Sequence, residues 1–380
     1  MKKYILLLCA AVLASGTVLS QELSFSGEVK TGVYWEQAQT GDKVTEIGEI
    51  HIHDRGYVPP GASRYAGDSS SNEGRFRLNL QFDHKDVGMK LRFEQTAWTD
   101  TSLPNWSYAF AYGNFISNQL KISAGRLGDS PWGAGGPELW TELDTKIGVR
   151  TEIKPNLLPG LNVGFVLNKW NGGEVTGTKT LAEMLQESVV GASYTNDFFH
   201  IRFAYRFDSD LDADDEEFVY RIEERALNMV LEGFQIIANG YYKGINQSEG
   251  GRGGSEPEFS FQNWLYVQYA PRDFTASVRF GLWTVPDRQI LSVKPGFYYN
   301  FFGNILNVGA YFLFEQDFGA NKFYEGSPYL ALELQPLVRL NFGDNFYTAL
   351  VYDYRSEYAE VRKDTIKTTH WFNLQVVYAF

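Results

Sequence analysis

The chain has 380 residues, of which 16% are aromatic, and a formal net charge of −12 at pH 7. This acidic balance argues against nucleic acid as a partner, because phosphate backbones are bound by clustered lysine and arginine. The only cysteine is Cys9, so the chain beyond it holds no disulfide, thiolate nucleophile or cysteine-bound metal. Beyond residue 20, no stretch approaches the roughly 18 consecutive apolar residues of a membrane-spanning helix.

The N-terminus has the order of regions found in secretory signals. Lys2 and Lys3 precede an apolar run over residues 5–14, and small residues follow as far as Ser20. We predict that residues 1–20 are a signal peptide and that residues 21–380 form one exported domain. An exported chain without disulfides suits a large closed sheet better than a small secreted scaffold.

The clearest periodicity lies between Arg75 and Glu94. Residues 75–83 and 87–94 alternate strictly between apolar and polar side chains around the polar turn His84-Lys85-Asp86. A period of two indicates strands, because successive side chains point to opposite faces. Membrane strands alternate in this way, so their averaged hydropathy is near neutral, in line with the mean hydropathy of −0.29.

The same pattern repeats along the chain. Phase is lost near Glu224-Arg225 in one segment, and Pro295 interrupts another, so 16 strands is the close alternative to our count of 18. The predicted strands are 23–35, 75–83, 87–94, 107–115, 120–125, 146–154, 161–168, 188–194, 199–207, 218–230, 234–243, 263–269, 274–283, 291–299, 305–314, 330–341, 346–354 and 368–380.

The connections alternate between short turns and long loops, and the long ones include 37–74, 126–145, 171–186 and 244–258. Transmembrane barrels connect their strands in this way, and a closed barrel removes the unpaired edges that a membrane forbids. The terminal strand alternates through Phe372, Leu374, Val376 and Tyr378 and ends on Phe380. A strand with this ending resembles the C-terminal signal of bacterial outer-membrane β-barrel proteins, and the overall layout resembles the porins.

The resemblance implies an all-β, antiparallel transmembrane barrel in the outer membrane, in contact with its lipids, with both termini on the periplasmic side and a homotrimeric assembly. In general porins the loop after the fifth strand folds into the lumen and narrows it. Here that loop is 126–145, and its acids are Asp129, Glu138, Glu142 and Asp144. The basic residues predicted to line the nearby wall are Arg75, Arg77, Lys90, Arg92, Lys121, Lys146 and Arg150.

Opposed charge rows across a narrow lumen select solutes by size and charge. The alternative is that these charges pair with one another as the polar lumen face of any barrel. His200, Arg202, Arg206 and Arg279 are further inward candidates.

Trp264, Tyr266 and Trp283 fall on the face assigned to the lumen. Interface aromatic girdles, or an error of phase, are the explanation we favour over an aromatic track inside the pore. The acidic run 208–217 lacks the spacing of a calcium loop and is expected to be solvated.

We find no catalytic constellation and expect neither a resident metal nor a cofactor. The sequence therefore favours a porin-like channel for passive diffusion of small hydrophilic solutes. The alternatives are a channel selective for sugars or anions, and a surface-interaction barrel with little conduction.

Overall fold

The computed structural model describes residues 22–40, 43–51, 75–95, 105–135, 143, 147–168, 188–206, 217–245, 258–285, 288–318, 330–358 and 366–380. The predicted signal peptide lies outside these ranges. Among the described residues, no helix has both the length and the apolar character needed to cross a membrane.

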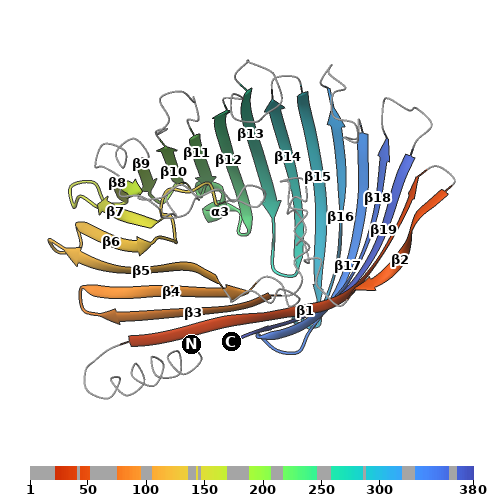
Figure 1. The fold of residues 1–380 in the computed structure, drawn as a ribbon, viewed down its shortest axis with the longest axis horizontal. Coiled ribbons are helices and arrows are strands. Elements are labelled where there is room, and N and C mark those ends of the chain that lie inside the picture. The colour runs from red at the N-terminus through yellow and green to blue at the C-terminus, as the bar shows by residue number, and fades with distance from the viewer. Residues whose placement is uncertain are drawn as a thin grey trace, which may run out of the picture.

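The described residues form 19 strands and one short helix, α3 (Ala226–Val230), and the strands join in one closed antiparallel sheet (Figure 1). The strands are β1 (Glu22–Thr40), β2 (Lys43–His51), β3 (Arg75–His84), β4 (Val87–Gln95), β5 (Asn105–Phe115), β6 (Leu120–Arg126), β7 (Ile147–Ile153), β8 (Leu161–Asn168), β9 (Val189–Thr195), β10 (Phe199–Arg206), β11 (Glu217–Glu224), β12 (Phe234–Ile245), β13 (Glu258–Tyr269), β14 (Phe274–Val285), β15 (Arg288–Phe301), β16 (Leu306–Asp317), β17 (Leu330–Asn341), β18 (Phe346–Tyr358) and β19 (Ile366–Ala379).

Nineteen strands occupy 18 positions around the barrel, because β2 and β3 share one side of β1. Residues 22–30 of β1 pair with β3, and its later residues, from Tyr34 onward, pair with β2. On its other side β1 pairs with β19 over 13 residues, which closes the sheet. The prediction of an 18-stranded antiparallel barrel is confirmed.

The C-terminal residue takes part in this closure. The Phe380 amide donates to the Gly27 carbonyl oxygen at 3.0 Å, and the Gly27 amide donates to the Phe380 carbonyl oxygen at 2.7 Å. The Phe380 ring lies directly over Gly27, where a Cβ atom would sit 2.4 Å from the ring. The aromatic ending that drew attention in the sequence therefore helps to join the first strand to the last.

Side chains alternate across the wall as the period of two requires. In β8 and β9, Phe165 and Val190 are exposed on the outer face, whereas their neighbours Val166 and Val189 are fully buried inside. Large apolar side chains are exposed on the outer face all the way around the ring, from Phe25 to Tyr378. This is the surface expected of a barrel whose solvent is lipid.

Two predicted segments contain an element that the sequence did not predict. The segment 37–74 is not wholly a loop, because β1 continues to Thr40 and β2 folds back onto it. The segment 218–230 is not wholly a strand, because β11 ends at Glu224 and α3 follows. The Glu224 carboxylate accepts the Leu227 amide at 2.6 Å, which satisfies a donor at the start of the helix and explains the loss of phase there.

Pro295 does not end its strand. It lies in β15 opposite Val278, and the pairing between β15 and β16 passes over Lys294 and Pro295 without a change of register. Proline has no amide proton, so a strand tolerates it at a position where no ladder hydrogen bond is needed.

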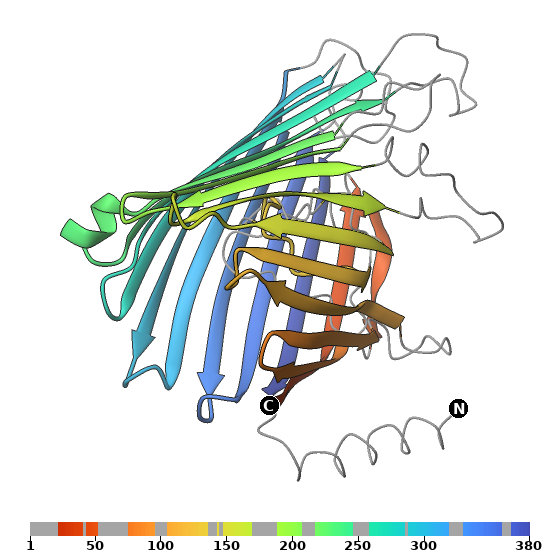
Figure 2. The ribbon, with the colours of Figure 1, turned by 90° about the vertical axis from the view of Figure 1, so that its left-hand side faces the viewer.

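The described strands differ in length around the ring. Strands β6 to β11 have 7 or 8 residues each, and β12 to β19 have 12 to 14. Figure 2 shows the short strands β6 to β8 beside the long strands that follow. The loop that follows β6 begins on this low side of the barrel.

Candidate functional site

The chain turns inward immediately after β6. Asp129 adopts a left-handed backbone conformation with φ of 52°, which aspartate tolerates better than most residues. The Ser130 hydroxyl then accepts the amides of Trp132, at 3.2 Å, and Gly133, at 2.9 Å. These bonds form a compact turn that presents the Trp132 side chain to the wall.

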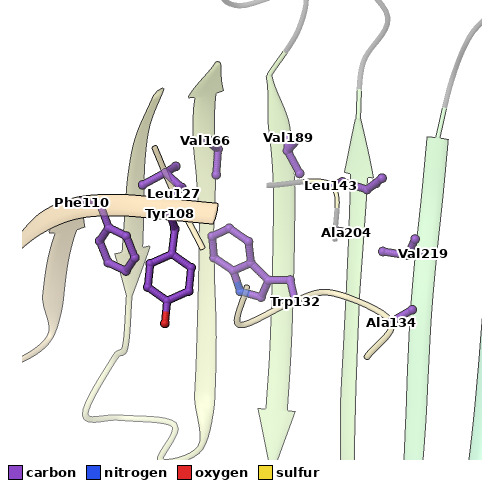
Figure 3. Close-up of a cluster of buried hydrophobic side chains, with 10 residues drawn as sticks. All are labelled: Tyr108, Phe110, Leu127, Trp132, Ala134, Leu143, Val166, Val189, Ala204 and Val219. Atoms are coloured by element: carbon purple, nitrogen blue, oxygen red, sulfur yellow. The ribbon is translucent and has the colours of Figure 1, made fainter. Parts of the chain in front are cut away.

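Apolar packing fixes the loop on the inner surface. Trp132, Leu127 and Ala134 are fully buried, and they pack with Leu143 against inward side chains of five strands (Figure 3). Those wall residues are Tyr108, Phe110, Val166, Val189, Ala204 and Val219. Their inward positions are apolar because the loop covers them.

Gly191 provides the space for Trp132. A Cβ atom at this position would lie 2.2 Å from the indole ring, a distance that no real contact allows. Glycine at an inward position of β9 therefore lets the ring rest on the backbone of the strand.

Arginines of the wall hold the loop through its main-chain carbonyl groups. Arg150 donates to the Gly128 oxygen at 3.1 Å, and Arg206 donates to the Leu143 oxygen at 3.0 Å. Arg202 donates to the Gly135 oxygen at 3.0 Å, and Arg221 donates to the same oxygen. Guanidinium groups suit this task, since each carries five donors in a rigid plane.

The predicted basic ladder divides into two groups. Lys90 binds an acid of the loop, Asp129, at 2.7 Å, and Arg150 binds the loop backbone. The other members contact the wall itself: Arg77 pairs with Glu94 at 2.7 Å, Arg92 donates to Asn79 at 2.7 Å, and Lys121 lies 3.7 Å from Glu152. Arg75 is described by its backbone in β3, and Lys146, Glu138, Glu142 and Asp144 lie outside the described residues.

The tall side of the barrel carries a different polar network. The Tyr311 hydroxyl donates to Glu333 at 2.7 Å, and Arg355 donates to the same carboxylate at 3.1 Å. The Gln335 amide donates to Asp353 at 2.8 Å. All of these side chains are buried, and each bond joins one strand to its neighbour.

Trp264 and Tyr266 point inward, so the favoured assignment of these rings to an interface girdle is wrong. Trp264 packs on the inner cluster and covers Gly281, and Lys294 lies 5.4 Å from the centre of its ring. The Arg279 guanidinium lies 4.8 Å from the centre of the Tyr266 ring. Cations over aromatic faces are stabilised by the ring quadrupole.

A recess of about 200 Å³ opens beside these aromatic residues. Its lining is rich in hydroxyl and amide groups: Tyr266, Gln268, Thr275, Ser277, Gly296, Phe297 and Tyr298. Among the described residues, no group of three histidine, cysteine, aspartate or glutamate side chains is placed to hold a metal ion.

Sequence reasoning missed the anchors of the loop. Arg221 and Trp132 were not singled out, and Arg202 and Arg206 were named as inward-facing residues without a partner. The available signal was the composition of the inward positions in β8 to β11, where Gly164, Val166, Val189, Gly191 and Ala204 replace the polar residues of a wet lumen. A small apolar patch inside a barrel indicates that another segment covers it.

No protein-family model and no curated protein sequence matches the chain. Solved structures do match its fold. The outer-membrane channel DcaP of Acinetobacter baumannii aligns with a TM-score of 0.55 and 9% identity over 95% of this chain and 97% of that one. OccAB4 of the same organism aligns with a TM-score of 0.52 and 9% identity over 95% and 99% of the two chains. OccK11 of Pseudomonas aeruginosa aligns with a TM-score of 0.51 and 10% identity over 94% and 96%.

The chain therefore has the fold of the bacterial outer-membrane porins and channels. The closed ring, the apolar outer face and the polar inner groups agree with that assignment and with a place in the outer membrane. In class, the protein is a closed antiparallel β-barrel with an apolar outer face.

Proposed function

We propose that the protein is a non-enzymatic pore for passive diffusion of small hydrophilic solutes, and that the loop over residues 126–145 narrows it. The observation that carries the proposal is the attachment of residues 127–135 and Leu143 to the inner wall by a buried tryptophan and four arginines. Attachment at so many points supports a loop that stays in the lumen and narrows it.

Charge selection in this proposal takes place between the loop and the basic wall. Lys90 and Asp129 face each other and are both partly exposed, so they are accessible to a passing ion. We assign the same lining role to the remaining predicted residues of the ladder and to the acids of the loop. Fixed charges of both signs in a narrow lumen set a transverse field that sorts solutes.

Planar-bilayer recording tests the proposal. Stable single-channel steps are expected from the folded protein, and a silent bilayer containing folded protein would contradict it. The double variant Arg202→Met/Arg221→Met removes both donors to the Gly135 oxygen, so we expect a larger and noisier conductance. The control is Arg339→Met, which removes an inward arginine bonded to Asn341 on the other side of the barrel at 2.6 Å.

The recess beside Tyr266 favours a second candidate, a substrate-selective channel. Hydroxyl and amide groups beside aromatic rings are the surfaces that bind hydroxylated solutes such as sugars. Saturable block of the current by one class of solute, lost in Gln268→Leu and retained in Gln235→Leu, would support this candidate. Equal permeation across a panel of sugars and anions would remove it.

We also propose that the protein is a homotrimer, as the porin-like layout implies. Crosslinking of the protein in its native membrane tests this assembly. A ladder that ends at three copies is expected, and crosslinked material that contains only monomer would remove the proposal.

A further inference from the structure

The turns that connect β5 to β6, β7 to β8, β9 to β10 and β11 to β12 carry large, exposed apolar side chains. Leu157, in the turn between β7 and β8, is 89% exposed, and Val230, in α3 between β11 and β12, is 87% exposed. Met229 is 70% exposed, and Ile116, in the turn between β5 and β6, is 68% exposed. Phe198, between β9 and β10, is exposed as well, so four consecutive hairpins share the feature.

This property does not belong to all turns of the barrel. The turn between β3 and β4 presents Lys85 and Asp86, and the turn between β13 and β14 presents Arg272 and Asp273. Both of these turns suit water. Apolar tips also occur at Phe302, between β15 and β16, and at Phe342, between β17 and β18, and the turns between β5 and β12 form the longest unbroken series of them.

The described strands on this side are also short. At about 3.3 Å per residue and a tilt of about 45°, a strand of eight residues climbs roughly 19 Å, less than the apolar band of about 25 Å of an outer-membrane barrel. The described parts of β6 to β11 have 7 or 8 residues. The apolar turn residues extend the outward apolar surface beyond the described strand ends on this side.

The tips lie next to the lipid-facing surface of the strands. Outward residues near these turns, Ile122 in β6, Ile153 in β7 and Ile222 in β11, are apolar and exposed. Figure 2 shows α3 projecting from the edge of the barrel beyond the strands that it joins. Large contiguous apolar surface on a folded protein marks a contact with a membrane or a partner.

We propose that the turns between β5 and β12, with α3, are inserted in the phospholipid leaflet on the turn side of the membrane. The occupant is the acyl-chain region of that leaflet, because the tips lie next to the surface that already faces lipid. The polar turns at Asp86 and Asp273 stay in water. This inference concerns the outside of the barrel and does not depend on what passes through the pore.

Site-directed spin labelling tests the proposal, and the mature chain suits it because Cys9 lies within the predicted signal peptide. Single variants Leu157→Cys, Met229→Cys and Val230→Cys would be labelled in the full barrel in phospholipid vesicles. Asp86→Cys and Asp273→Cys serve as matched controls at polar turns. Accessibility to oxygen, which concentrates in acyl chains, is compared with accessibility to a water-soluble nickel chelate.

The expected result is a gain of oxygen accessibility and a loss of nickel accessibility at the three apolar positions relative to both controls. Nickel accessibility equal to that of the controls would overturn the proposal. Exclusion of both reagents, together with dipolar broadening between labels, would also overturn it, because a second copy of the chain would then cover the turns. Conductance of the same vesicles is measured separately, so a failed channel and a failed leaflet contact are distinguishable.

Discussion

The low wall, formed by β6 to β11, and the tall wall, formed by β12 to β19, both place arginines inside the barrel. These arginines bind different kinds of partner. On the low wall, Arg202 and Arg221 donate to a carbonyl oxygen of an inserted loop. On the tall wall, Arg355 binds the Glu333 carboxylate of the neighbouring strand. The first arrangement attaches a loop to the wall, and the second joins strands that are already adjacent in the sheet.

The comparison teaches that an inward arginine in a barrel is not by itself a selectivity residue. Its role depends on what faces it. Of the five predicted ladder residues whose side chains are described, Arg77, Arg92 and Lys121 contact the wall, and Arg150 contacts both the wall and the loop. Variants on the low wall should therefore change the shape of the pore, and variants on the tall wall should change the stability of the barrel.

The largest expected effect is on the low wall. Trp132→Ala removes a fully buried indole, and such truncations cost about 3–5 kcal/mol. The cost falls on docking of the loop, so we expect faster proteolysis of the loop and a larger, noisier conductance, with little change in unfolding of the barrel. Trp106→Ala, which truncates an outward ring, is the control. Unchanged proteolysis and conductance in Trp132→Ala would show that the loop is held by other contacts.

On the tall wall, Arg355→Met should act on stability. Removing one partner of a buried ion pair costs about 3 kcal/mol, because the remaining charge is left without its counter-charge; here that group is Glu333, 4% exposed. Urea unfolding followed by tryptophan fluorescence should show the loss, while single-channel conductance changes little. Arg355→Lys is the control that keeps the charge. A loss below about 1 kcal/mol would mean that lumen water screens the pair.

An intermediate effect is expected at the contact between the loop and β9. Gly191→Ala places a Cβ atom against the Trp132 ring, and overpacking of this kind costs about 1–3 kcal/mol. The penalty should disappear in the background of Trp132→Ala, which a double-mutant cycle on loop proteolysis measures. Gly296→Ala is the control, since its nearest neighbour would lie at 3.3 Å. Additive effects of the two changes would argue against direct packing.

The smallest effect on stability is expected for Lys90→Met. Lys90 and Asp129 are partly exposed, and ion pairs of this type contribute about 0–1 kcal/mol. The pore should nevertheless become more cation-selective, because a positive charge is lost while Asp129 stays. The reversal potential in a salt gradient measures the change. Lys85→Met, in the turn between β3 and β4, is the control. The shift should shrink in about 1 M salt, where the Debye length is roughly 3 Å.

Much of the barrel could be predicted from the sequence because its signal is local. Alternation in 75–83 and 87–94, polar turns and the aromatic C-terminus are each visible within about ten residues, and together they gave the strand count. Errors arose where pairing is remote. The extension of β1 onto β2 depends on register with a partner, and the end of β11 at Glu224 depends on a bond from the Glu224 side chain to the helix.

The lumen was less predictable for the same physical reason. Sequence alone identifies Arg202 and Arg206 as inward residues, since alternation assigns faces, but it does not identify the carbonyl groups that they meet 63 to 67 residues away. Trp132 and Gly191 are likewise unremarkable in sequence, and their contact exists only because a loop from β6 crosses to β9. Period and composition determined the barrel, its membrane-facing surface and the sign of its wall charges. Only the closed tertiary structure decided which of those charges contact the loop and which pair along the wall, because both depend on contacts between residues far apart in the chain.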